Sequence, residues 1–193
     1  MKYYLGVALV LFALVIIGST FLPLLQAELG YHLREIEPQD QKDTLEPLDK
    51  DFGIVIPKIG ANAHVIKNVN PYDARIYQSA LSRGVAHAQG TALPGQKGNI
   101  FLFSHSSSDF LNAIRYNSIF YLLTKLEKGD LIKIYFEGKE YDYIVKGKQI
   151  VESNAIKYLT DKTTEENLTL MTCWPPGTSL KRLIVLASKN NPL

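Results

Sequence analysis

The sequence predicts an all-β protein: a closed β-barrel of eight strands with a few short helices, preceded by one N-terminal transmembrane helix. Three observations support this fold class. From residue 53 onward the chain consists of short segments rich in β-branched and aromatic residues, separated by turn residues. Eight such segments with few helical patterns between them favour a closed or nearly closed barrel. The first 27 residues, by contrast, contain a long run without a charged side chain.

The composition excludes several classes of protein. The chain has 193 residues, of which 46% are hydrophobic and 21% charged, which is too apolar and too mixed in charge for a disordered protein. Its one cysteine excludes an intrachain disulfide scaffold and a cysteine-cluster zinc site. A net charge of +2 argues against a dedicated nucleic-acid binder. The four histidines, at positions 32, 64, 87 and 105, show no close ligand spacing, so we expect no metal cofactor from them.

Residues 1–27 predict a membrane anchor with a short cytoplasmic tail. No side chain between Tyr3 and Ala27 is charged, and residues 5–25 supply the roughly 20 apolar positions that a helix needs to cross the hydrocarbon core. Lys2 precedes this run and acids follow it, so the positive-inside rule predicts an extracytoplasmic body held by a single span in the cell membrane. The alternative is a cleaved signal peptide, for which residues 25–27 (LQA) form a poor cleavage site.

Residues 28–52 predict an acidic extracytoplasmic linker. They carry eight acids against three bases, whereas residues 53–193 carry 17 bases against 11 acids. The segment has few large apolar residues after Ile36 and contains Pro38 and Pro47, which is typical of a spacer, with a short helix at its start. The alternative is a lid that folds over the active site.

The body of the protein, residues 53–193, contains the eight predicted strands. A tight turn at residues 137–139 (EGK) predicts a hairpin between two of them. Residues 73–81 predict a helix, and residues 109–126 a mixture of helix and loop with a buried segment at 119–123. The predicted strands span residues 54–59, 63–66, 85–87, 99–105, 130–136, 140–145 continuing to 151, 168–173 and 182–188.

The lone cysteine is the strongest functional signal. An exported protein with a single cysteine carries a thiol that cannot pair within the chain, although such a residue can also be a small buried apolar side chain. Cys173 ends a predicted strand, and a short loop containing Pro175 and Pro176 leads to the next strand, which begins near Arg182. Strands joined by so short a loop are antiparallel neighbours, so we expect the thiol and the guanidinium to face each other at one end of the barrel.

His105 is the candidate acid or base. It ends an apolar strand and is followed by three serines, a position suited to chemistry, although a loop histidine bonded to those serines is the alternative. His87 lies between two alanines in a short extended segment, and we interpret it as structural.

These motifs together resemble those of the sortases, the membrane-anchored cysteine transpeptidases of Gram-positive-type cell envelopes. Residues 169–173 (TLMTC), followed nine positions later by Arg182, resemble the family signature. Ser104 departs from the family pattern, in which a glycine often precedes the histidine. The sequence after Cys173 looks closest to class D or E. The resemblance extends over about residues 52–188 and includes residues 83–87 (RGVAH), 90–95 (GTALPG), 98–100 (GNI) and 126–130 (LEKGD).

The resemblance implies a site and a reaction. Cys173 matches the nucleophile, His105 the catalytic histidine that acts as general acid and base, and Arg182 the arginine that stabilises the oxyanion or the substrate. Thr172 is a further candidate for contact with the substrate. The implied reaction cleaves an LPxTG-like sorting signal of a surface protein through a thioester. The acyl group then passes to an amine of a peptidoglycan precursor or of another protein.

Other functions are compatible with parts of the pattern. An L,D-transpeptidase places its cysteine close to its histidine in the sequence, and a papain-like protease places the cysteine first; neither order is found here. A non-catalytic envelope-binding domain on the same barrel is the alternative from a different class. We expect the specificity loop within residues 151–167. No cofactor is predicted, and calcium is the one weak candidate, with ligands among Glu152, Asp161, Glu165 and Glu166.

Overall fold

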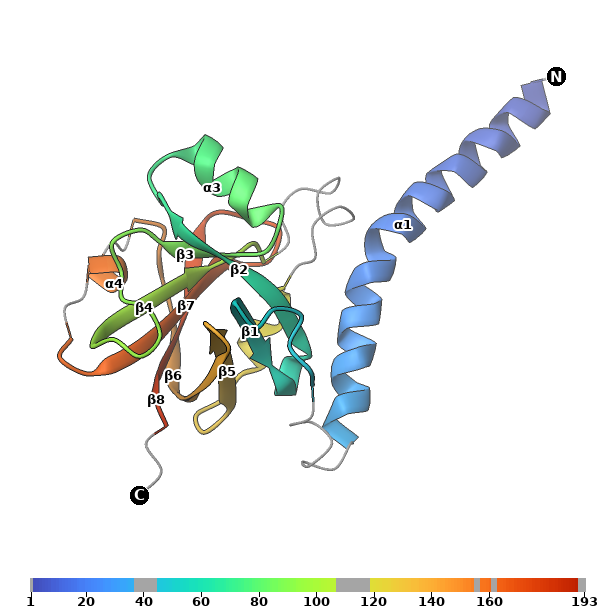
Figure 1. Ribbon diagram of the computed structural model, residues 1–193. Coiled ribbons are helices and arrows are strands. Elements are labelled where there is room, and N and C mark those ends of the chain that lie inside the picture. The colour runs from blue at the N-terminus through green and yellow to red at the C-terminus, as the bar shows by residue number, and fades with distance from the viewer. Residues whose placement is uncertain (1, 37–44, 107–118, 155–156, 161–162, 191–193) are drawn as a thin grey trace.

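Eight strands form a closed barrel in the order β1-β2-β3-β4-β7-β8-β6-β5, which confirms the predicted architecture (Figure 1). The computed structural model describes residues 2–36, 45–106, 119–154, 157–160 and 163–190. Most neighbouring strands are antiparallel, whereas β2–β3 and β4–β7 are parallel. The strands are β1 (Phe52–Ile56), β2 (Ala61–Val69), β3 (Val85–Ala88), β4 (Gly98–Phe103), β5 (Leu131–Phe136), β6 (Lys139–Glu152), β7 (Glu166–Trp174) and β8 (Lys181–Lys189).

Local backbone rules explain two of the connections. The β5–β6 hairpin turns through Glu137 and Gly138, whose φ values of 52° and 77° are typical of the type I′ turn that matches the twist of the strands. The strand predicted over residues 54–59 is too long. Pro57 has no backbone N–H to donate, so β1 ends at Ile56 and the short helix η1 (Pro57–Ile59) follows it.

Two apolar clusters lie on the two faces of the barrel wall. Side chains that point inward, such as Ile100 and Leu102 of β4 and Leu170 of β7, belong to the interior core. Their outward neighbours Phe101 and Phe103 belong to a second cluster on the outside of the wall. The alternation of a β-strand thus places every second residue of β4 and β7 on an outer surface that is also apolar.

Besides η1, the described residues form three more short helices beside the barrel, in line with the few that were predicted: α3 (Ala74–Leu81), α4 (Lys157–Thr160) and η2 (Tyr121–Lys125). α3 begins after Asp73, whose side chain accepts hydrogen bonds from the backbone N–H groups of Arg75 and Ile76 and so caps the helix. α3 buries Ala80 and Leu81 in the outer cluster. Residues 107–118, which cover most of the predicted helix-and-loop segment, lie outside the described residues.

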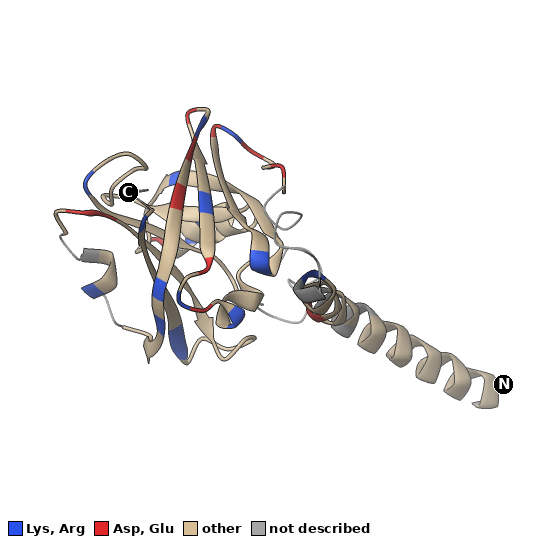
Figure 2. Cartoon of the chain, turned by 90° about the horizontal axis from the view of Figure 1, so that it is seen from below, with Lys and Arg blue, Asp and Glu red and all other residues tan. Residues whose placement is uncertain are grey.

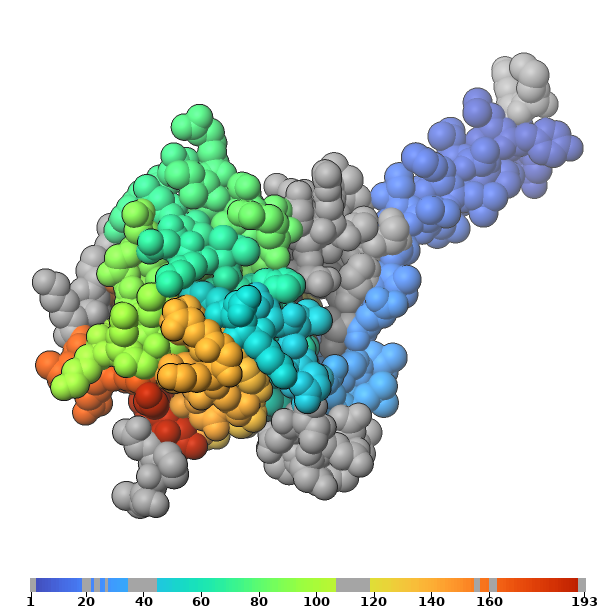
Figure 3. All heavy atoms as spheres, viewed as in Figure 1, coloured from blue at the N-terminus to red at the C-terminus, as the bar shows by residue number. Residues whose placement is uncertain are grey.

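The N-terminal helix α1 (Lys2–Ile36) departs from the predicted boundaries. It includes residues 5–25, but among the described residues no helix combines the length and apolarity needed to cross a membrane, so the predicted anchor is not supported. The helix continues past residue 27, and its C-terminal part packs on the barrel through the buried Tyr31 and the Glu28–Lys125 ion pair of 3.3 Å. Its N-terminal part projects from the barrel (Figure 3) and bears no charged side chain over most of its length (Figure 2).

The end of the predicted linker is also attached to the barrel. The backbone N–H of Leu48 donates to the side chain of Asn62, and that side chain donates to the carbonyl oxygen of Glu46. The carboxylate of Asp49 lies 3.0 Å from the imidazole of His64. Residues 45–51 therefore lie beside β2. Residues 37–44 lie outside the described residues.

Candidate active site

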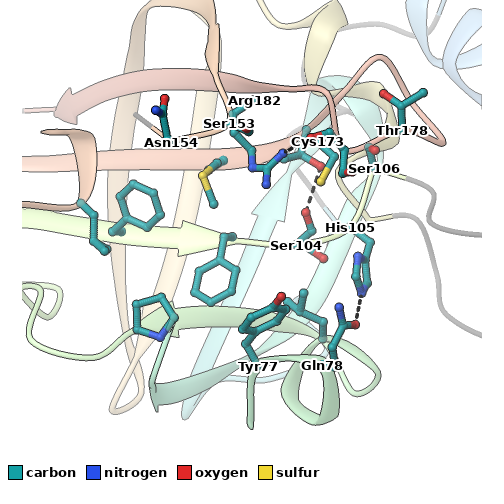
Figure 4. Close-up of a pocket in the computed structure, with 18 of the residues that line it drawn as sticks. Tyr77, Gln78, Ser104, His105, Ser106, Ser153, Asn154, Cys173, Thr178 and Arg182 are labelled. Carbon is teal, nitrogen blue, oxygen red and sulfur yellow. Dashed lines mark hydrogen bonds between the residues drawn. The ribbon is translucent and has the colours of Figure 1, made fainter. Parts of the chain in front are cut away.

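A cavity of about 460 Å³ opens on the outer face of the barrel wall, and the four sequence-predicted site residues line it. Figure 4 labels three of them, Cys173, His105 and Arg182. Its walls come from the ends of β4 and β7, the start of β8, helix α3 and the loop after β6. The described residues that line it include Cys173, His105, Arg182 and Thr172, with Phe101, Phe103, Met171, Tyr77 and Leu159 as apolar neighbours.

The antiparallel ladder between β7 and β8 places the thiol beside the guanidinium. Cys173 is the register partner of Arg182, and directly opposed residues of such a pair point to the same face. Both side chains are half-buried. The Nη1 of Arg182 donates to the carbonyl oxygens of Ser179 and Lys181, each at 3.0 Å, so the end of the loop and the first residue of β8 hold the guanidinium. The expected juxtaposition of Cys173 and Arg182 is confirmed.

The parallel pair β4–β7 brings His105 to the same end of the barrel. Phe103 pairs with Met171, so the residues that follow each strand segment remain side by side. The backbone N–H of Ser104 donates to the carbonyl oxygen of Met171 at 3.2 Å. The imidazole Nε2 of His105 lies 3.1 Å from the side-chain Oε1 of Gln78 on α3. The histidine thus lines the cavity in contact with a helix as well as with the barrel.

Thr172 lines the cavity but makes a contact that the sequence did not predict. Its hydroxyl donates to the carbonyl oxygen of Ser104 at 2.9 Å, and the side chain is only 3% exposed. This bond links β7 to the residue before His105. Because the hydroxyl donates its proton to Ser104, the Thr172 side chain holds two strand ends together. Its contact with substrate stays a prediction.

His87 is buried in the barrel, away from the described lining of the cavity. The backbone N–H of Asn68 donates to its Nδ1, and its Nε2 donates to the carbonyl oxygen of Ala92 at 2.9 Å. Burial lowers the pKa of His87 below its usual 6.5, although the bond to Ala92 partly opposes this and the nearby Lys67 adds to it. His87 is therefore a neutral histidine that joins β3 to its neighbouring segments, as interpreted from the sequence.

Sequence reasoning missed Gln78 and the apolar wall of the cavity. The wall was detectable in principle, because both faces of β4 and β7 carry large apolar residues and a strand with two apolar faces must be covered on both. The loop expected to determine specificity, residues 151–167, contributes Ser153, Asn154 and Leu159 to the lining. No local pattern marks Gln78, because only the packing of α3 places it beside the cavity.

The described residues include no group of three or more histidine, cysteine and acidic side chains suited to a metal ion. Among the calcium candidates, Glu166 is held by Tyr143 and Gly95 on one oxygen and by Lys189 on the other. Burial alone would raise the pKa of Glu166, but these hydrogen bonds outweigh it and lower that pKa. Glu152 lies 3.6 Å from Lys181, and Asp161 lies outside the described residues.

The comparison with known protein families decides the family. A family model described as the Sortase domain matches residues 54–190, the whole of the barrel. The chain belongs to the sortase family. Members of this family are cysteine transpeptidases that are generally associated with the membrane or the cell envelope.

Individual sortases are distant relatives of this chain. Sortase D of Bacillus subtilis (strain 168) is 26% identical over 137 residues, which cover 69% of this chain and 61% of that protein, so the match spans less than two thirds of the relative. The crystal structure of sortase C-1 from Actinomyces oris superposes with a TM-score of 0.62 and 28% identity over 81% of each chain.

A second similar structure shows the fold alone. The Clostridium perfringens sortase D5 transpeptidase has a TM-score of 0.59 and 21% identity, with 84% of this chain and 94% of that chain covered. These similar proteins carry the class names C and D, so the family is established while the class, expected from the sequence to be D or E, stays a prediction.

Proposed function

We propose that this sortase is a transpeptidase that cleaves an LPxTG-like sorting signal through a thioester on Cys173 and transfers the acyl group to an amine of the cell envelope. The observation that carries the proposal is the convergence of Cys173, His105 and Arg182 on one cavity, although 68 residues separate the histidine from the cysteine. A thiol, an imidazole and a guanidinium in one cleft form a set suited to acyl transfer.

In the acylation step, the thiolate of Cys173 attacks the carbonyl carbon of the scissile peptide bond. The new C–S bond gives a tetrahedral intermediate whose oxygen carries the negative charge, and Arg182 is the cation in the cavity wall that can stabilise it. The imidazolium of His105 protonates the departing amine as the C–N bond breaks. The product is a thioester and a free amine.

In the transfer step, the incoming amine attacks the carbonyl carbon of the thioester. His105, now neutral, takes the proton from this amine, and the C–S bond breaks to regenerate the thiolate of Cys173. The cycle therefore restores both groups and needs no cofactor. The same residue serves as acid in the first step and as base in the second.

The apolar wall of the cavity supports a peptide substrate with an apolar side chain. Phe101 and Phe103 of the outer apolar cluster, and Met171, which packs against it, line the cavity. A volume of about 460 Å³ is within the usual range for a specific pocket and accommodates a few residues of an extended peptide. Ser153 and Asn154 supply polar groups at the rim.

The implied partners are surface proteins with a C-terminal sorting signal and an amine acceptor, either a peptidoglycan precursor or another protein. We place the activity at the cell envelope because the sortases generally work there.

The test incubates the full-length protein with a library of LPxTG-like peptides, with and without an oligoglycine amine, and uses mass spectrometry to detect an adduct. A peptide thioester on Cys173 that the amine converts to a transpeptidation product would support the proposal. Peptide binding without an adduct on Cys173 would instead support a non-catalytic binding domain. Turnover that survives Cys173→Ala would overturn the nucleophile assignment.

A further inference from the structure

We propose that Gln78 is a positioning residue for His105: its side-chain oxygen holds the imidazole Nε2 proton, so that the proton exchanged with substrate is carried on Nδ1. The inference rests on the proposed function for its consequence in catalysis. The underlying statement about the imidazole can be measured without any substrate.

The contact between the two side chains is direct. The Oε1 of Gln78 lies 3.1 Å from the Nε2 of His105, and Figure 4 shows the amide of Gln78 directed at the imidazole edge, with both side chains at the margin of the cavity. An amide oxygen is only an acceptor, so the imidazole nitrogen that it contacts carries the hydrogen.

The helix that bears Gln78 is firmly attached to the barrel. Asp73 caps its first turn, and the carbonyl oxygen of Gln78 accepts the backbone N–H of Ser82 at 3.1 Å. Tyr77, the preceding residue, packs edge-on against Phe103 with ring centroids 6.4 Å apart. The backbone of Gln78 is therefore fixed relative to the strand that leads to His105.

Backbone hydrogen bonds attach the residue before His105 to the barrel. Ser104 bonds to Met171 through its N–H and to Thr172 through its carbonyl oxygen, whereas His105 follows the last residue of β4 by two positions. These backbone bonds place the Cα of His105 but leave the rotation of its side chain to be set by side-chain contacts. The bond to Gln78 is a side-chain contact that restrains this rotation.

A neutral amide suits a residue that must act first as acid and then as base. The hydrogen on Nε2 is present in the imidazolium and in the neutral tautomer that Gln78 favours, so the bond persists through the cycle. A carboxylate in its place would stabilise the imidazolium and hinder its action as an acid. Gln78 therefore fixes the orientation and tautomer while adding no charge, a role analogous to the third group that orients the base in other nucleophilic sites.

The first test is a nitrogen-15 NMR titration of the imidazole in the full-length protein without substrate. We expect neutral His105 in the wild type to be the Nε2–H tautomer, and Gln78→Met to lose this preference because a thioether cannot accept the bond at comparable strength. Gln78→Glu should raise the pKa of His105 by about one unit. The other titratable groups in the described cavity lining, Cys173, Arg182, Tyr72 and Tyr77, are the same in all variants.

The second test measures kcat, KM and the pH profile of peptide transfer for the same variants, with Ser79→Ala on the same helix as the matched control. We expect Gln78→Met to lower kcat by about tenfold or more with little change in KM, since misorientation of a catalytic group affects the chemical step. Gln78→Glu should shift the pH profile upward, and Ser79→Ala should behave as wild type.

The two proposals fail in different ways. An Nδ1–H tautomer in the wild type, or a tautomer unchanged in Gln78→Met, would overturn the positioning role even if transfer is observed. An equal loss of activity in Ser79→Ala would also overturn it, because the effect would then belong to the helix. Absence of any transfer by the wild type, together with the expected NMR result, would overturn the proposed reaction and leave the Gln78–His105 contact established.

Discussion

Cys173 and Arg182 are directly opposed partners in the β7–β8 ladder, each one residue from the end of its strand. Their proximity is thus a property of the barrel wall and not of a loop conformation. A strand pair fixes the separation of two side chains more firmly than a loop does, and preorganised geometry is what electrostatic stabilisation of a transition state requires. Substitutions at these two positions should therefore change the chemistry without moving the strands.

Arg182→Lys should reduce kcat of transfer by about 10²-fold, the usual cost of losing one oxyanion donor. A lysine ammonium keeps the charge, but it cannot reproduce the planar fork whose Nη1 bonds to Ser179 and Lys181 hold it in place. Steady-state kinetics of the peptide-plus-amine reaction measures the effect. Lys181→Ala, at the adjacent exposed position, is the control and should retain activity. A wild-type rate in Arg182→Lys would show that charge alone suffices.

Cys173→Ala should abolish the thioester and the transfer reaction while leaving the melting temperature within a few degrees of the wild type. The thiol is half-buried at the cavity wall, so its removal leaves no sealed void in the core. Mass spectrometry of the protein after incubation with peptide measures the first effect, and circular dichroism measures the second. A collapsed melting temperature would instead assign Cys173 a structural role.

Thr172→Val should destabilise the fold by about 1–3 kcal/mol, because it leaves the buried carbonyl oxygen of Ser104 without its donor. Thr172→Ser keeps the hydroxyl and should recover most of this loss. Urea unfolding measures the free energy. Since the same bond joins β7 to the residue before His105, Thr172→Val should also lower kcat, and Thr172→Ser should restore it. Normal stability in Thr172→Val together with a raised KM would favour direct contact between the threonine hydroxyl and the substrate.

The barrel and part of the site could be predicted from the sequence for identifiable physical reasons. Alternation along each strand and the type I′ turn at Glu137 and Gly138 are local signals. The short loop after Cys173 determines that β8 returns beside β7, so the approach of Arg182 also follows from local sequence. The strand predicted over residues 54–59 is too long because Pro57 has no N–H to donate and β1 therefore ends at Ile56.

The remaining features depend on contacts between distant segments. The bond from Thr172 to Ser104 joins residues 68 positions apart, and it exists because β4 and β7 are parallel neighbours, an arrangement that no short motif encodes. The position of Gln78 depends on which outer face α3 covers. The helix α1 extends beyond residue 27, the predicted end of the membrane anchor. In this extension Tyr31 packs against the interior core. The sequence predicts a short helix at the start of the linker, but composition cannot reveal that Tyr31 packs against the barrel.

The buried neutral His87 predicts a dependence of stability on pH in the range just below 6.5. Its pKa in the folded protein is lowered from 6.5, chiefly by burial, so below pH 6.5 the unfolded chain binds a proton that the folded protein does not yet bind. The contribution of His87 to stability is therefore fully present above pH 6.5. It is lost as the pH falls toward the lower pKa that His87 has in the folded protein. The lowered pKa values of Glu166 and Asp49 act below pH 4.5 and so lie outside this window.

The experiment compares melting temperatures of the wild type and His87→Gln from pH 7.5 to 5. Glutamine retains a donor near the Ala92 carbonyl oxygen but cannot titrate, so the variant should be less stable at pH 7.5 yet lose less stability on acidification. The peptide transfer rate at pH 7.5 should change little, because His87 lies outside the described lining of the cavity, whereas His105→Ala should nearly abolish it. If the melting temperatures of the two proteins fell equally between pH 7.5 and 5, the buried neutral state of His87 would be contradicted. An inactive but folded His87→Gln would move the catalytic role to His87.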